Sequence, residues 1–341
     1  MAAAVTDLDR APVAFGRWAV PQLFSELQQP EAARRLPALA SLCDLMHDPE
    51  RLYETVNGGF LEQLKVLLQD EDPSVRRKTC ELLHLLTAHS IGRRALLASS
   101  LLPPLSELLD DSSSSCRRNV LQVLNRLAEL PAGAAALLTL VPKLMLTLRQ
   151  EEEDEEEEEL LLSTLSCCSK LNALPALASD GVSLLGHKLS HSSPNIRREA
   201  AAAMMELSVP LDGKRQVCEL QVLPVLVGLL QDEDAEVQTN AAGVIMNTVI
   251  ITAGKLQCLD LHVIPVLLQL LSEKQEKEEE RRRRKALVLY SLRALTALAE
   301  APVGRRLLLE QLPVLVRRSE EEDQDIQQAA QTAIGVITWT P

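Results

Sequence analysis

The stretch QVLPVLVGLLQDEDAEVQTNAAGVIMNT, residues 221–248, contains one complete unit of a helical repeat. Its first half spaces apolar residues at i, i+3, i+4 and i+7, the pattern of one helix face: Leu223, Leu226, Val227 and Leu230. Polar residues then break the pattern, and Asp234 is placed to cap a second helix. That helix has an apolar stripe of its own: Val237, Ala241, Val244, Ile245 and Thr248. Two amphipathic helices of this length cannot bury both stripes alone, so the unit requires neighbours.

Equivalent residues recur at a step of 41, as in Leu185, Leu226 and Leu267. Five glycines mark the same repeat: Gly92, Gly133, Gly213, Gly254 and Gly304. Each is predicted to end the preceding helix in a left-handed conformation. Four of them adjoin a short basic and apolar segment, such as GRRALL from Gly92, that predicts an extra short helix. Three helices in about 41 residues is the armadillo pattern. The predicted fold is therefore all-α: an armadillo/HEAT-like, right-handed superhelical solenoid of about seven to eight repeats.

The repeat pattern also predicts the organisation of the chain. Residues 1–18 are weakly patterned and are expected to be loose or to cap the first repeat, and 19–341 to form the solenoid. Two interruptions are expected: an acidic loop at 150–159, which either stays in solution or frays the start of the next helix, and a charged insert at 273–285. A column of helix caps is predicted in phase with the repeat: Asp72, Ser113, Ser193 and Asp234.

Composition excludes several classes of function. The formal net charge is −13, and it would be −4 without the nine acids of 151–159. A nearly balanced remainder with 2% aromatics argues against binding nucleic acid. The cysteines number seven, an odd count that favours buried thiols in a reducing compartment over a disulfide framework. The start lacks a signal-peptide pattern, and no apolar run is expected to reach the roughly 18 residues of a membrane helix. A cytosolic location, or one in an assembly reached from the cytosol, is expected.

Arginine pairs recur where the long helices are expected to begin: Arg76 and Arg77, Arg117 and Arg118, Arg197 and Arg198, with Arg283 and Arg284 in the insert. Positive charge at a helix amino terminus is unfavourable, so each pair should have an acidic neighbour. One interpretation is an internal ladder with turn acids such as Asp70, Asp72 and Asp110. The other is a basic stripe that binds an acidic partner.

Asparagines form a second candidate set, namely Asn119, Asn240 and Asn247. Armadillo proteins that hold extended peptides use asparagines on the inner helix to bond the peptide backbone. Here the positions in phase with Asn240 include Lys78 and Glu199. The asparagine ladder is therefore broken, and no tryptophan column accompanies it, which disfavours a nuclear-import type of peptide groove.

No pattern of catalytic, cofactor-binding or metal-binding residues is recognised. His187 and His191 are spaced i, i+4, and Cys167 and Cys168 lie upstream, but no further ligands stand at a recognisable distance. The sequence lacks a phosphate-binding glycine loop, a nucleophile elbow and an HExxH motif. We therefore predict a protein that is not an enzyme and that takes no cofactor, small-molecule substrate, nucleic acid or membrane.

Several stretches resemble one family, the armadillo-repeat radial spoke head protein 14 homologues of motile cilia and flagella. They are LCDLMHDPE (42–50), GKRQVC (213–218), NAAGVIM (240–246), ITAGK (251–255), AEAPVGR (299–305), the acidic interruption at 151–159 and the ending IGVITWTP. The resemblance covers nearly the whole chain from about Ala14. The arginines at 281–284 depart from it.

The resemblance implies a non-enzymatic structural subunit of the axonemal radial spoke, located in the cytoskeleton of the cilium or flagellum. Its partners would be other radial spoke proteins, bound through the arginine pairs and the surfaces of the long helices. The alternative is a soluble adaptor that binds a client peptide in a concave groove, as other armadillo proteins do.

Overall fold

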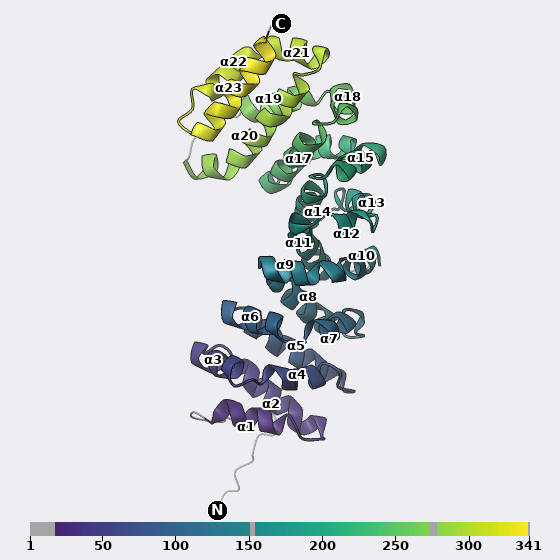
Figure 1. The fold of residues 1–341 in the computed structure, drawn as a ribbon, viewed down its shortest axis with the longest axis vertical. Helices are drawn as coiled ribbons and strands as arrows, with labels where there is room; N and C mark the ends of the chain where they lie inside the picture. The colour runs from purple at the N-terminus through teal and green to yellow at the C-terminus, as the bar shows by residue number, and fades with distance from the viewer. Residues whose placement is uncertain (1–17, 151–153, 273–277, 340–341) are drawn as a thin grey trace, which may run out of the picture. The chain divides into compact units, whose positions relative to one another are not determined.

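The computed structural model describes residues 18–150, 154–272 and 278–339, and every regular element among these residues is a helix (Figure 1). Most of the segment 1–18, for which a loose or capping structure is expected, lies outside the described residues. The chain divides into two compact units, residues 1–140 and 141–341, which are described separately below.

The first unit consists of a helical pair followed by two complete repeats and the beginning of a third. Each complete repeat has a first, a second and a longer third helix. The elements are α1 (Ala19–Glu26), α2 (Ala32–Leu45), α3 (Pro49–Asn57), α4 (Leu61–Leu67), α5 (Pro73–Thr87), α6 (Ser90–Ala98), α7 (Leu102–Glu107), the 3-10 helix η1 (Leu108–Asp110), α8 (Ser114–Ala128), α9 (Pro131–Leu137) and the 3-10 helix η2 (Leu138–Leu140).

The second unit begins with the second and third helices of the repeat that carries the acidic run, and four complete repeats follow. The elements are α10 (Val141–Arg149), α11 (Glu155–Leu171), α12 (Leu174–Leu177), α13 (Gly181–Lys188), α14 (Pro194–Leu207), α15 (Leu211–Glu219), α16 (Leu223–Leu229), α17 (Ala235–Thr248), α18 (Thr252–Asp260), α19 (Val263–Ser272), α20 (Glu278–Leu298), α21 (Pro302–Leu309), α22 (Leu312–Ser319) and α23 (Gln324–Thr338). Repeats of three helices confirm the predicted solenoid class.

Successive third helices pack side by side within each unit: α2, α5 and α8 in the first, and α11, α14, α17, α20 and α23 in the second (Figure 1). The stripe predicted for α17 is confirmed, because Val237, Ala241, Val244, Ile245 and Thr248 are all buried. In α16, Leu226 is fully buried, whereas Val227 is only partly covered. Each third helix therefore buries its apolar face against the helices of its neighbours, as a repeat stack requires.

The repeat glycines do not adopt the left-handed conformation that the sequence analysis predicts. Gly59 is the only glycine with positive φ among the described residues. The marker glycines instead lie within the short first helices, and a Cβ on any of them would overlap the carbonyl oxygen six residues earlier: Leu86, Leu127, Leu207, Thr248 or Leu298. Glycine is required because the first helix crosses the carboxyl end of the preceding third helix at backbone contact.

The residue after the glycine explains why the motif is basic. Lys214 Nζ donates to the carbonyls of Ser208 (3.0 Å) and Val209 at the carboxyl end of α14. Arg93 Nη1 and Arg305 Nε donate in the same way to Thr87 O and Ala299 O, both at 3.2 Å. These side chains satisfy carbonyls that have no partner within their own helix, at the end where positive charge is favourable.

Left-handed backbone does recur in the second unit, but at the junction between the first and second helices. Asp180, Gln221 and His262 have φ of 58°, 55° and 53°, and they are 41 residues apart. Non-glycine residues reach this region at a modest energetic cost. The chain turns sharply there, as the bend of 80° between α18 and α19 on either side of His262 illustrates.

The acidic loop predicted at 150–159 is helical from Glu155 onward. Asp154 caps α11, its carboxylate accepts hydrogen bonds from the N–H groups of Glu156 (3.1 Å) and Glu157 (3.3 Å), and the acids from Glu155 to Glu158 form the first turn. Negative charge is favourable at a helix amino terminus, and this outweighs the mutual repulsion of the acids. Residues 151–153 lie outside the described residues.

The charged insert predicted at 273–285 is likewise helical from Glu278 onward, because it extends the amino end of α20. The predicted cap column holds in part: Asp72 and Asp234 accept backbone N–H groups, whereas Ser113 and Ser193 occupy the cap position without a side-chain hydrogen bond.

One helical run, Pro131–Arg149, is long and apolar enough to cross a membrane by length and composition alone, contrary to the expectation that no run would be. It comprises α9, η2 and α10. Of its most apolar window, 44% is buried within the protein, and the buried residues include Leu137, Leu144 and Leu148. Core helices of soluble proteins pass the same test, so the run carries little weight as a membrane segment.

The glycine contact yields a matched pair of substitutions. Gly213→Ala is expected to lower the free energy of unfolding by about 2 kcal/mol or more, since its Cβ overlaps Leu207 O. Gly228→Ala, with nothing within 4 Å of its Cβ, is expected to raise that free energy by about 0.5 kcal/mol through helix propensity. Urea unfolding monitored by circular dichroism measures both. Equal effects would contradict the close approach.

Candidate protein-interaction surface

In two of the pairs the first arginine, Arg76 or Arg197, holds its own turn together and reaches the next repeat. Arg197 Nη1 donates to His191 O (3.0 Å) and Ser192 O (2.8 Å), while its Nε and Nη2 donate to Asp232 at 2.8 and 3.1 Å. Arg76 repeats the arrangement with Asp70 O (2.9 Å) and with Asp111 Oδ2 (2.7 Å). These contacts favour the interpretation as an internal ladder for the first arginines.

Arg35 belongs to the same column, although the sequence analysis did not single it out. Its Nη1 donates to Gln29 O (2.9 Å) and Pro30 O (2.6 Å), and its Nη2 lies 2.8 Å from Asp70 Oδ2. Arg35 precedes Arg76 by one step of 41 residues. Extending the repeat by one step toward the amino terminus would therefore have identified it. Arg117 keeps the turn contact, with Nη1 3.0 Å from Asp111 O.

The acceptors of this ladder are themselves fixed by their turns. Asp70, Asp111 and Asp232 each accept the N–H two residues later, at 3.0, 2.8 and 2.9 Å. His191 occupies the same place in its repeat, where Nδ1 accepts from Ser193 N at 3.1 Å. His191 is therefore a turn residue. No group of three or more potential metal ligands occurs among the described residues, so His187 and His191 gain no further ligands there.

Electrostatics agrees with the ladder geometry. Burial alone would raise the pKa of Asp232, but hydrogen bonds from Arg197 and from the Asp234 N–H lower it below its ordinary value. The hydrogen bond between Arg197 and Asp232 also raises the pKa of Arg197. Both side chains are largely covered, with 18% and 7% exposure, so the pair is screened less than a surface ion pair.

The second arginines differ from one repeat to the next. Arg198 pairs with Asp234 and lies 3.3 Å from Glu236 Oε2, so its charge is also matched internally. Arg118 is partly buried and interacts with neighbouring groups. Arg77 is exposed, and so is Arg283 of the insert, whose side chain is 75% exposed.

The predicted asparagines connect successive third helices. Asn119 Nδ2 donates to Arg77 O (3.5 Å) and Asn240 Nδ2 donates to Arg198 O (3.4 Å), in each case 42 residues back. Asn247 Nδ2 donates to Met205 O (3.2 Å) and Ser208 Oγ (3.0 Å). These amides therefore donate to carbonyls of the preceding repeat. In peptide-binding armadillo proteins, such asparagines bond the backbone of the bound peptide instead.

Arg126 occupies the place of Asn247 in the first unit. Its Nη1 donates to His84 O at 2.6 Å, again 42 residues back. Burial, together with the charge of Arg126, lowers the pKa of His84 to about 4, and the imidazole Nδ1 is buried without a hydrogen-bond partner. His84 is thus held neutral in the folded chain.

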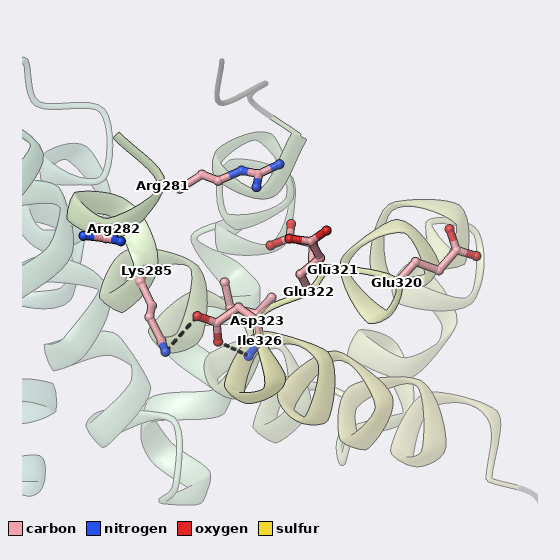
Figure 2. A pocket seen from close by; sticks show the side chains of 8 residues that line it. All are labelled: Arg281, Arg282, Lys285, Glu320, Glu321, Glu322, Asp323 and Ile326. Atoms are coloured by element: carbon pink, nitrogen blue, oxygen red, sulfur yellow. Dashed lines mark hydrogen bonds and ion pairs between the residues drawn. The ribbon is translucent and has the colours of Figure 1, made fainter. Parts of the chain in front are cut away.

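The insert at the start of α20 faces the turn between α22 and α23 across a cavity of about 430 Å³ (Figure 2). Arg281, Arg282 and Lys285 line one side, and Glu320, Glu321, Glu322 and Asp323 line the other. Lys285 Nζ lies 2.8 Å from Asp323 Oδ2 and 2.6 Å from Asp325 Oδ2. The basic residues that depart from the resembled family therefore lie opposite acids of the last repeat.

A second cavity of about 400 Å³ continues along α20 and α23, and its lining includes Arg293, Glu300, Asp325 and Gln328. Asp325 belongs to this cavity and its partner Lys285 to the first, so the ion pair joins their rims. The lining combines charged side chains of both signs with apolar surface, which suits a partner segment better than a purely apolar ligand.

The cysteines are packing residues. Six of the seven are buried, and Cys167 is partly exposed. Burial raises the pKa of the thiols of Cys43, Cys168 and Cys258 to about 12, so these thiols stay protonated at neutral pH. Cys80 and Cys116 lie with their sulfurs 3.7 Å apart between α5 and α8.

Comparisons with known proteins agree on the architecture. Residues 212–247, which span α15 to α17, match the Armadillo/beta-catenin-like repeat. Residues 38–174 match the family described as non-SMC mitotic condensation complex subunit 1. The crystal structure of an engineered protein superposes with a TM-score of 0.75 over 94% of this chain and 89% of its own, at 21% identity. The chain has an armadillo-repeat fold.

A designed armadillo repeat protein is also similar, with a TM-score of 0.61 and 20% identity over 67% of this chain and 99% of its own. Identities of this size establish the fold alone. The armadillo-repeat fold is typically that of a protein-interaction scaffold. In this chain, the surfaces available for interaction include the third helices and the two cavities described above.

The ladder yields a test that separates its two interpretations. Asp232→Ala is expected to lower the free energy of unfolding by about 2 kcal/mol, because it leaves the Arg197 guanidinium and the Asp234 N–H without their acceptor. Glu233→Ala, an exposed acid of the same turn, should change it by less than about 0.5 kcal/mol. Urea unfolding of both variants measures the difference. An Asp232→Ala protein as stable as the parent would favour the partner-binding stripe.

His84 predicts a pH dependence. Its folded pKa of about 4 lies below the ordinary value of 6.5, so its stabilising contribution is present above pH 6.5 and is lost as the pH falls toward 4. His84→Gln should flatten the dependence of unfolding free energy on pH in this window, by about 1 kcal/mol given the partial exposure of the ring. His89→Gln, at an exposed histidine, serves as the control. The same slope in all three proteins would show that His84 titrates freely.

Proposed function

We propose that this chain is a non-enzymatic scaffold subunit of the axonemal radial spoke in motile cilia and flagella. It would bind other radial spoke proteins through an extended helical-repeat surface and belong to the cytoskeleton of the axoneme. The observation that carries the proposal is the set of stretches that resemble radial spoke head protein 14 homologues, combined with an armadillo-repeat fold.

Several of those stretches lie at repeat junctions. GKRQVC and ITAGK contain Gly213, Lys214 and Gly254, whose contacts join a first helix to the preceding third helix. NAAGVIM lies in α17, where Asn240 and Ala241 face the preceding repeat and the core. The resemblance therefore falls on residues that set the geometry between repeats, and such geometry determines which partners a scaffold can bring together.

The internal ladder also supports a structural role. Ion pairs and side-chain hydrogen bonds join neighbouring repeats at several levels, as Arg197 with Asp232 and Asn247 with Met205 illustrate. A stack connected in this way resists relative sliding of its repeats. Resistance of this kind suits a subunit that transmits force within an assembly.

A soluble adaptor that binds a client peptide is the second candidate. The two cavities along α20 and α23 favour it, because the charged side chains of both signs in their linings could accept a segment with both basic and acidic side chains. Both candidates use surfaces rather than chemistry, so they differ in where the protein resides.

Fractionation of ciliated cells distinguishes the two. The tagged full-length chain is expected to stay with detergent-extracted axonemes and to cross-link to spoke subunits once the spokes are released by salt. Leu226→Asp, which places a charge at a fully buried position, should unfold several repeats and be absent from the axonemes. Gly228→Ala should be retained like the parent. Recovery of the parent chain in the detergent-soluble fraction would favour the adaptor.

A further inference from the structure

Two thiols meet in the core of the first unit, where α5 packs against α8. The Sγ atom of Cys80 lies 3.7 Å from that of Cys116, and both side chains are fully buried. The two residues are 36 apart in sequence, so their contact joins successive repeats. The ion pair of Arg76 with Asp111 spans the same junction. The thiol pair therefore lies where a rung of the ladder already connects two repeats.

The repeat framework does not require cysteine at either position. Cys80 is the eighth residue after the cap of its third helix, and Cys116 is the third residue after the cap of the next. Both positions are aliphatic and fully buried at other junctions: Leu39 with Val75, Leu162 with Ile196, and Ala201 with Val237. Cysteine can pack in such places as a small apolar residue. A pair of thiols also brings a reactivity that the packing does not need.

The contact is close to the geometry of a disulfide. A sulfur–sulfur bond is about 2.0 Å long, so the two sulfurs are about 1.7 Å beyond bonding distance. A change between staggered rotamers about one Cα–Cβ bond moves a sulfur by more than this. The bond would close a loop that contains α6 and α7, and it would connect α5 directly to α8.

We propose that Cys80 and Cys116 form a disulfide when the folded chain meets an oxidising disulfide of low molecular weight. One protein thiol loses its proton and attacks the external disulfide, which gives a mixed disulfide and releases one thiolate. The second protein thiol then loses its proton and attacks the protein sulfur of the mixed disulfide, which releases the other thiolate. Two protein thiols are thus oxidised, and one external disulfide is reduced to two thiols.

The surroundings of the pair make this exchange slow in both directions. The hydrogen bond with Cys116, together with burial, raises the pKa of the Cys80 thiol well above its ordinary value, so little thiolate is present in the folded chain. Reaction therefore requires local opening of the first unit. Once formed, the disulfide is covered by the same packing, which keeps attacking thiols away from it.

A disulfide at this place would fasten one repeat junction covalently. It would restrict the unfolded chain through a loop of 36 residues, which favours the folded state. The first unit would then resist unfolding more strongly under oxidising conditions than under reducing ones. This property goes beyond the scaffold role and does not depend on the spoke assignment.

Equilibration of the purified full-length chain with mixtures of reduced and oxidised glutathione tests the proposal. Separate samples start from the reduced and from the previously oxidised chain, and they are held until both give the same composition. After free thiols are blocked with N-ethylmaleimide, trypsin should release a disulfide-linked pair of peptides, residues 79–93 and 95–117. The equilibrium constant for this disulfide should be at least about tenfold higher in native buffer than in concentrated urea, because folding holds the sulfurs together.

Variants connect the disulfide to stability. Oxidation is expected to raise the urea midpoint of the parent chain, measured by circular dichroism. Cys80→Ala combined with Cys116→Val, which installs the residues found at Ala201 and Val237, should have the same midpoint under both conditions. Cys167→Ala, at a partly exposed thiol of the second unit, is the matched control and should keep the shift of the parent chain.

Four results would overturn the proposal: no linked pair of peptides 79–93 and 95–117 at the oxidising end of the series, another pairing of cysteines that predominates in the folded chain, equal equilibrium constants with and without urea, or an oxidation shift that the double variant retains. Because samples approach equilibrium from both sides, a slow reaction cannot be mistaken for an unfavourable one. These measurements use purified protein, so their failure would leave the fractionation result, and with it the scaffold proposal, unaffected.

Discussion

Each third helix has an apolar face that only the neighbouring repeats can cover, and this constraint determines the rest of the structure. Val237 and Ile245 of α17 are fully buried although no other part of their own repeat is large enough to enclose them. Because α14 and α20 supply the cover, neighbouring repeats must keep the same spacing and register. A fixed repeat length follows, and a fixed length places polar residues opposite the same partners in each repeat. The hydrogen-bonded ladder is a consequence of burial.

Register explains how so many charges are matched internally. Arg76 and Arg197 each reach an aspartate 35 residues ahead, and Asn240 and Asn247 each reach a carbonyl 42 residues back. Both sequence separations are close to the length of one repeat. The first is slightly shorter because its acceptor lies in the turn that precedes the next third helix. The same kinds of hydrogen bond and ion pair therefore satisfy the buried polar groups at successive repeat junctions. What remains for partners is the set of positions that the ladder leaves out.

The sequence was sufficient for the helical class and the repeat length, because apolar spacing within a helix and a period between helices are both visible in one chain. The repeat of the glycines was predicted correctly, but the left-handed conformation predicted for them was wrong. A left-handed cap and a close helix crossing both require a residue without Cβ, and only the backbone path distinguishes them. Gln221 and His262 show the converse: their backbone is left-handed, yet neither residue type predicts that conformation.

The candidate site was less predictable for a related reason. Arg76 and Arg77 are adjacent in sequence, yet the first is bound within the ladder and the second is exposed. A helix rotates by about 100° per residue, so neighbours face different surroundings, and their roles depend on which face meets the next repeat. The acidic run at 154–159 could be predicted to tolerate a helix start, but Asp154 as its cap depends on where the chain turns.

Partner binding in such a stack is best sought where repeats differ, since common features serve the framework. Lys214, Arg93 and Arg305 serve the junctions alike in three repeats, so their charges do not distinguish one repeat from another. The exposed residues Val209 and Ile250 do distinguish them, because the same position is alanine or glutamate in other repeats. A solenoid stabilised by identical contacts can vary such positions without loss of folding. The same separation of framework from surface lets one fold present different partner sites along its length.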